Sequence, residues 1–208
     1  AESVAARVRE SGLPNYFGDQ RFGRDYETLR LGLELLRGTR EPGQIPRARR
    51  KFLLRLALSS VQSALFNRTV ATRLTAGTLF RVRPGDVMQV VATGGPFVVE
   101  DVDREQPRFE ARETVIAGPM FGPKMKPAGG EVAAWEDQLL AGAGLSRDEF
   151  TRFPQLTSGT RRACLVWPDD LRATQVESGV QFEFSLPSGS YATVLLRELM
   201  KAPPGQGS

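Results

Sequence analysis

Apolar residues recur at helical spacing through the first third of the chain. Leucines three or four residues apart predict a helix over residues 25–37, which ends at Gly38. A longer stripe of the same spacing predicts the strongest helix of the chain, over residues 47–74. A short helix over residues 3–9 precedes both, and Gly12 and Pro14 end it. Between the two longer helices, the glycine- and proline-rich residues 38–46 are typical of a crossing between domains.

Strand patterns dominate the remainder. Strict alternation predicts a strand over residues 180–186 with Val180, Phe182, Phe184 and Leu186 on one face. Further predicted strands cover residues 79–83, 87–91, 97–102 and 161–166, the first three as a meander. Helices are predicted over residues 131–143, 147–150 and 191–200, the last capped by Ser190, and an irregular loop over 118–130. Residues 103–112 are too polar to assign, and the tail 202–208 is typical of disorder. The fold class is α+β.

Composition excludes several functions. The 208 residues contain no histidine, which rules out Ser-His and Cys-His nucleophiles and His-ligated zinc within this sequence. No apolar run is long enough for a membrane helix, and no signal peptide is apparent. Cys164 is the only cysteine, so an internal disulfide is impossible and a cytoplasmic, reducing location is expected.

Positive charge is concentrated near the start. The net charge is +4, yet residues 1–60 hold 12 basic and 7 acidic side chains. Cations at the start of a helix oppose its dipole, so helix stability does not explain the cluster that opens the helix at residue 47. The cluster predicts an external anion, such as phosphate, or a neighbouring carboxylate as its partner, and a solvated helix face is the alternative; its members are Arg47, Arg49, Arg50, Lys51 and Arg55.

Two segments combine aromatic, glycine and polar residues in patterns suited to a flat anionic ligand. In residues 12–23, GLPNYFGDQRFG, a ring such as Phe17 could stack on a base while Arg21 holds a phosphate and Asn15 offers both a donor and an acceptor. In residues 184–199, FSLPSGSYATVLLREL, a strand, a turn and a helix start leave backbone N–H groups free for an anion. On composition alone, a turn with core aromatics and an ordinary strand–turn–helix unit are the favoured interpretations.

Taken together, the two runs resemble the TruD family of tRNA pseudouridine synthases. Three intervening runs are similar to that family in the same order, so the resemblance extends from about Gly12 to Leu199; they are SALFN (63–67), AGPMFG (117–122) and GTRR (159–162). The resemblance implies part of a mixed-sheet catalytic domain interrupted by an inserted α+β domain. It divides the chain into a catalytic remnant (1–45), the TruD insertion domain (46–172) and a C-terminal segment that returns to the catalytic domain (173–208).

The resemblance also implies an activity. Family members isomerise uridine in tRNA, typically at position 13, to pseudouridine without cofactor or metal. It implies that Phe17 packs against the flipped uracil and that Asn15 braces the catalytic loop. The C-terminal motif would complete the substrate site through Leu186, Ser188, Ser190 and Arg197.

One family feature does not occur in these 208 residues. The catalytic aspartate of the family lies in a G-x-K-D-R-x-A run on the amino-terminal side of NYFG, and neither Asp19 nor Asp25 matches it. We therefore expect this aspartate to lie upstream of Ala1, so that the chain alone contains no catalytic residue and is inactive. The strand at residues 180–186 is expected to have an open edge. A non-catalytic RNA-binding module with the same fold is the alternative function.

Overall fold

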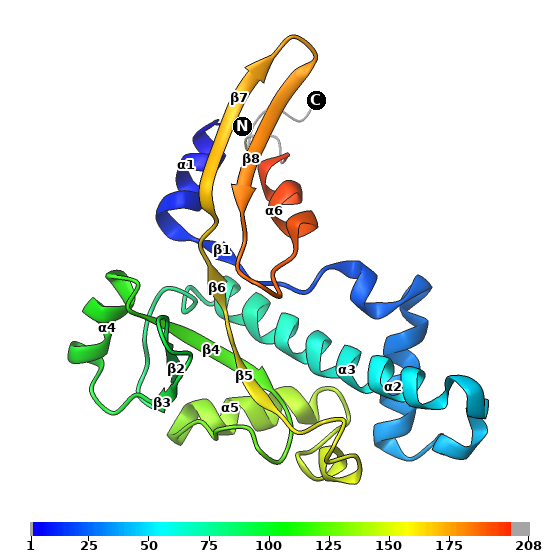
Figure 1. The fold of residues 1–208 in the computed structure, drawn as a ribbon. Coiled ribbons are helices and arrows are strands. Elements are labelled where there is room, and N and C mark those ends of the chain that lie inside the picture. The colour runs from blue at the N-terminus through cyan, green and yellow to red at the C-terminus, as the bar shows by residue number, and fades with distance from the viewer. Residues whose placement is uncertain (1, 201–208) are drawn as a thin grey trace. The chain divides into compact units, whose positions relative to one another are not determined.

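A computed structural model describes residues 2–200, which form two compact units (Figure 1). The terminal unit consists of residues 2–18 and 165–200, and the central unit of residues 19–164. Residues 19–45 pack within the central unit and residues 165–172 within the terminal unit, and the domain limits at 45/46 and 172/173 stay a prediction. Ala1, where the predicted catalytic remnant begins, lies outside the described part, as does the predicted disorder of residues 202–208.

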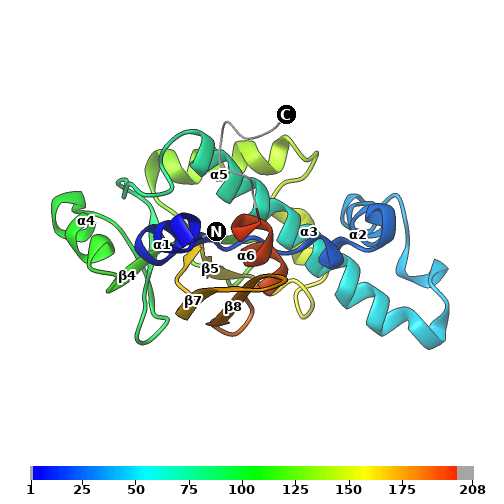
Figure 2. The same cartoon turned by 90° about the horizontal axis from the view of Figure 1, so that it is seen from above.

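Two helices cover one face of a β-hairpin in the terminal unit. The hairpin consists of β7 (Asp169–Val176) and β8 (Gly179–Ser185), and the helices are α1 (Glu2–Ser11) and α6 (Ala192–Leu199). Figures 1 and 2 show α1 and α6 side by side on the same side of this hairpin. A second antiparallel pair joins β1 (Leu13–Pro14) to β6 (Leu165–Val166).

The alternation predicted for β8 is present over most of its length. Phe182, Phe184 and Leu186 are half-buried against the core of this unit, whereas Gln181 is exposed. Val180 is an exception: it lies next to the hairpin turn and is exposed despite its place in the alternation. Apolar residues of α1, β1, β6, β7 and α6 make up the rest of that core. Among residues 2–200, β8 pairs only with β7, so its other edge is open, as the sequence predicted.

The helices of the central unit follow the predictions closely. The helix expected over residues 25–37 is α2 (Glu27–Arg37), and the one expected over 47–74 is α3 (Arg47–Thr75). Gly32 brings the two helices together, since a Cβ atom there would collide with the carbonyl oxygen of Ala57. The other helices include α5 (Gly130–Ala141) and short 3₁₀ segments; these are η1 (Asp19–Phe22), η2 (Arg24–Tyr26), η3 (Pro42–Gln44) and η4 (Asp148–Arg152).

An antiparallel sheet in the order β3-β2-β4-β5 completes the central unit. Its strands are β2 (Val87–Val90), β3 (Pro96–Val98), β4 (Thr114–Met120) and β5 (Thr160–Ala163). All seven residues of β4 are buried, so the predicted loop at 118–130 is wrong for its first three residues. Pro119 is compatible with the strand because that part of β4 pairs with β5 alone. The unassigned polar segment contains a helix, α4 (Val102–Glu110), capped by the Asp101 carboxylate.

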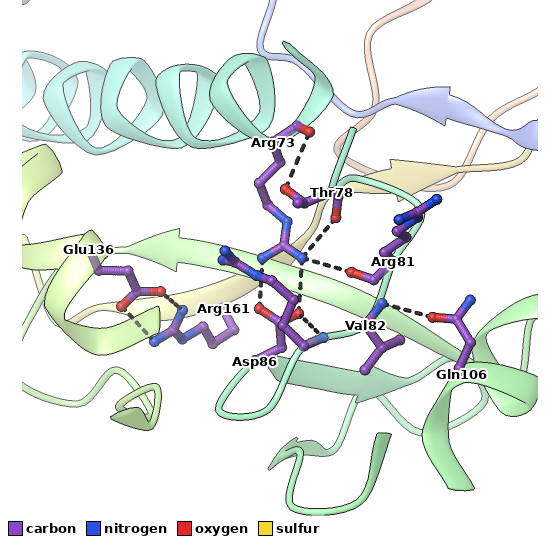
Figure 3. A network of polar contacts seen from close by, with 9 residues as sticks. Arg73, Thr78, Arg81, Val82, Asp86, Gln106, Glu136 and Arg161 are labelled. Atoms are coloured by element: carbon purple, nitrogen blue, oxygen red, sulfur yellow. Dashed lines mark hydrogen bonds and ion pairs between the residues drawn. The ribbon is translucent and has the colours of Figure 1, made fainter. Parts of the chain in front are cut away.

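The strand predicted over residues 79–83 does not form, because Arg73 binds this segment as a turn (Figure 3). The guanidinium of Arg73 donates to the carboxylate of Asp86 at 2.6 and 2.9 Å and to the carbonyl oxygens of Thr78 and Arg81. Arg73 and Asp86 are both almost completely buried. Within the predicted strand, the Arg81 carbonyl thus accepts a hydrogen bond from the end of α3 and does not take part in a β-ladder.

Removing the carboxylate of Asp86 should destabilise the central unit strongly. In Asp86→Ala the Arg73 guanidinium stays buried without a counter-charge, a situation that costs about 3–5 kcal/mol. Urea denaturation measures this loss. Glu34→Ala is the matched control, because it removes the exposed pair with Arg40 and should change stability by less than about 1 kcal/mol. Similar losses in the two variants would contradict the importance of the buried pair.

Cys164 provides a second test, because it is buried in the interior of the central unit. Burial raises the pKa of its thiol from 9.0 to about 11, so the folded state holds the proton above pH 9 more strongly than the unfolded state. The free energy of unfolding should therefore fall between pH 9 and 11, in addition to any change seen in Cys164→Ala. Iodoacetamide at about pH 8 should leave the native thiol unmodified and alkylate it in urea. Rapid alkylation of the native protein would contradict its burial.

Candidate functional site

The terminal unit brings the two recognised motifs into contact. Phe17, in the first motif, lies with its ring centroid 5.8 Å from that of Tyr191, in the second, and the ring planes meet at 65°. These residues lie near opposite ends of the sequence, yet both belong to the same unit. The contact is an edge-to-face aromatic pair. The structure therefore places the two motifs at one location.

A glycine and a short strand position the first motif. Gly12 ends α1 with φ +79° and donates its N–H to the carbonyl of Val8 at 2.9 Å. The indole of Trp167 packs so closely on Gly12 that an added Cβ atom would lie 2.9 Å from Cε2. Leu13 then pairs with Val166. Residues 15–17 thus follow a backbone that is fixed by a left-handed residue, a ring and a β-bridge.

The second motif turns sharply between β8 and α6. Ser190 donates its backbone N–H to the carbonyl of Pro187 at 3.1 Å, and Gly189 has φ +85°. The N-cap of α6 is Tyr191, which makes no side-chain capping bond, so the prediction that Ser190 caps this helix is wrong. The extended conformation of Tyr191 directs the chain into the helix and places its ring against Phe17.

The predicted substrate-binding residues of the terminal unit differ in exposure. Phe17 is only 8% exposed and Asn15 is also buried, so these two side chains are packed. Leu186 and Ser190 are half-buried, and Ser188 and Arg197 are exposed. Tyr191 was not among the predicted site residues, although an aromatic residue next to the glycine turn of the recognised motif was a signal for it. Its half-buried ring is more accessible than that of Phe17.

Arg21, the remaining residue of the predicted site, belongs to the central unit. Its Nε atom donates to the hydroxyl of Ser63 on α3 at 3.2 Å. Part of its hydrogen-bonding capacity therefore serves to fasten η1 to α3. Its predicted contact with a phosphate stays a prediction.

The cluster of cations at the start of α3 divides into two kinds. Arg50 donates to the carbonyl oxygens of Ile45 and Gly43 at distances of 3.0 to 3.1 Å, which explains its position by local structure. The side chains of the other four are exposed and make no hydrogen bond or ion pair with another described residue; they are Arg47, Arg49, Lys51 and Arg55. Since α3 contains no acidic residue, these charges remain available for an external anion.

The described residues offer no candidate for a metal centre or for a membrane-spanning helix. Residues 2–200 contain no cluster of three acidic or cysteine side chains that could hold a metal ion. None of the helices in the same range combines the length and the apolar character needed to cross a membrane.

Comparison with known proteins identifies clear relatives. The family model described as tRNA pseudouridine synthase D (TruD) matches residues 46–199. A protein of Anaeromyxobacter sp. (strain Fw109-5) named tRNA pseudouridine synthase D is 42% identical over 202 residues, which are 97% of this chain and 58% of that protein. One of the same name from Thermus thermophilus (strain ATCC 27634) is 41% identical over 97% of this chain and 53% of its own length. This chain thus spans somewhat more than half of these relatives.

A solved structure has the same fold. It comes from Methanosarcina mazei, is provisionally described as a tRNA pseudouridine synthase D (TruD), and superposes with a TM-score of 0.76. The match covers 98% of this chain and 64% of the other, at 24% sequence identity. This likeness confirms the predicted α+β class.

The ring contact between the motifs should be measurable as a coupling energy. A double-mutant cycle of Phe17→Leu and Tyr191→Leu, followed by urea denaturation, should give about 0.5–1.5 kcal/mol of coupling, the value typical of aromatic pairs. Tyr191→Phe keeps the ring and should preserve the coupling. Additive losses in the double variant would show that the two rings do not stabilise each other.

Proposed function

The chain belongs to the tRNA pseudouridine synthase D (TruD) family, and on that premise we propose that the protein converts a uridine of tRNA, at position 13, to pseudouridine. The reaction breaks the bond between N1 of uracil and the ribose, rotates the base and joins the ribose to C5; C5 releases a proton and N1 takes one up. The base stays on the same nucleotide, so the reaction is an isomerisation and requires no redox cofactor.

The contact between Phe17 and Tyr191 is the observation that carries this proposal for the described residues. An enzyme that acts on a base within a folded RNA must extrude the nucleotide and compensate the lost stacking, which amounts to a few kcal/mol. Aromatic side chains recover about 1–3 kcal/mol per base. Two rings from distant segments, fixed at one place, form the kind of wall that an extruded uracil requires.

The remaining residues of the two motifs have supporting roles in the proposal. Asn15 is buried and braces the loop that carries Phe17. Leu186, Ser188, Ser190 and Arg197 surround Tyr191 in the sequence of the second motif and complete the pocket from that segment. The exposed Arg197 is suited to a phosphate of the extruded nucleotide. On the central unit, Arg21 and the four exposed cations at the start of α3 are proposed to bind tRNA phosphates.

The catalytic aspartate of the reaction is not assigned to any of the 208 residues. No G-x-K-D-R-x-A run occurs from Ala1 to Ser208, and the chain spans little more than half of its relatives. In the proposal, the terminal unit provides the aromatic residues, the central unit provides phosphate contacts, and the catalytic aspartate is not among the described residues.

Tritium release from tRNA labelled at C5 of uridine tests the proposal. The protein encoded by the complete reading frame should release tritium, and we expect none from the 208-residue chain. Phe17→Leu retains an apolar side chain but removes the ring, and should lower kcat/KM about 5- to 150-fold, as the loss of one stacked base predicts. Phe17→Tyr is the matched control and should stay close to wild type.

Two results would contradict these assignments. If Phe17→Leu, folded and present at the same concentration, releases tritium at the wild-type rate, the ring has no role in binding uracil. If the complete protein binds tRNA but releases no tritium, the alternative of a non-catalytic RNA-binding module replaces the synthase.

A further inference from the structure

Phe52 is the most exposed aromatic ring among residues 2–200, at 67%, although it lies in the middle of a charged helical turn. Its neighbours Leu53 and Leu54 pack against the core of the central unit, so the helix already buries an apolar face without it. A single solvated phenylalanine outside that face adds nothing to the packing. Local structure therefore does not account for this ring.

Basic residues lie on both sides of Phe52 along the helix. Arg49 precedes it by three residues and Arg55 follows it by three, which places one arginine a helical turn away on each side of the ring. Lys51 is adjacent in the sequence and exposed as well. The helix provides no acidic residue to neutralise these charges, and its positive N-terminal dipole adds to them.

We propose that Phe52 stacks on an unpaired base of the RNA while Arg49, Lys51 and Arg55 bind the flanking phosphates. The inference rests on the proposed function for its ligand, and it adds a contact outside the terminal unit that carries Phe17. Proteins that bind single-stranded nucleic acid combine aromatic platforms with cations in this way. The ring recognises the flat face of a base, and the cations follow the backbone on either side of it.

Charge and shape favour RNA over other macromolecules at this surface. An amphipathic helix that binds a membrane inserts a broad apolar face, whereas here one ring is exposed between cations. The centre of a protein interface is depleted of charged residues, and here arginines flank the ring directly. A ring between phosphate-binding side chains matches the alternation of base and phosphate in a nucleotide chain.

Equilibrium binding of the protein encoded by the complete reading frame tests the inference, with two probes. One is an unmodified tRNA transcript; the other is a fully paired RNA duplex of equal length. Phe52→Ala and Phe52→Leu should weaken tRNA binding about tenfold and leave duplex binding unchanged, while Phe52→Trp keeps wild-type affinity. Leu74→Ala is the matched control, since Leu74 is an exposed apolar residue (43%) at the other end of the same helix.

Salt dependence separates the ring from the cations. Arg49→Gln and Arg55→Gln should each reduce the slope of log K against log salt by about one on both probes, whereas Phe52→Ala should not change it. Wild-type tRNA affinity in Phe52→Ala, or full affinity in Phe52→Leu, would overturn the stacking contact. Tritium release by the wild-type protein is scored independently: its absence, with a tRNA-specific loss in Phe52→Ala, would reject the proposed synthase while supporting this contact.

Discussion

A single hydrophobic core built from both ends of the chain is the constraint on which the candidate site depends. A two-stranded hairpin such as β7–β8 is marginally stable by itself, and α1 and α6 supply the apolar surface that it lacks. Burial of α1 fixes where the chain continues through Gly12 and Leu13, and burial of α6 fixes where Tyr191 begins its helix. The contact between Phe17 and Tyr191 is therefore a consequence of a core to which both ends of the chain contribute, and neither motif would form it alone.

Arginines of the central unit lie in two different environments. At the end of α3, Arg73 is buried and its charge is balanced by Asp86, with carbonyls accepting further hydrogen bonds. Arg161 is buried in the same manner against Glu136. At the start of α3, four cations face solvent without a described partner. Because burying an unpaired charge is costly, interior arginines need carboxylates, whereas exposed ones are free to bind an external anion.

The sequence predicted elements that have a strong period and missed those determined by distant side chains. The long leucine stripe and the alternation from Val180 to Leu186 predicted α3 and β8 within a residue or two. Residues 79–83 have a strand-like composition, yet Arg73 binds the carbonyls of Thr78 and Arg81, and no local pattern contains that information. Pro119 is typical of a loop, but it lies in the part of β4 that pairs with β5 alone, and this pairing is not visible in the local sequence. The family resemblance located the two motifs, but the ring of Tyr191 became a site residue only through its contact with Phe17.

The proposed reaction requires two kinds of contact that one type of residue cannot provide. Extrusion of a nucleotide costs a few kcal/mol, and a stacking contact returns about 1–3 kcal/mol, so one ring leaves little surplus for affinity. Phosphate contacts supply affinity regardless of sequence, but they do not distinguish a base from its neighbours. Rings held in the core of the terminal unit suit the first task because a packed side chain loses little freedom on binding. Long, solvated arginines on α3 suit the second, since they adapt to a flexible backbone without disturbing the core.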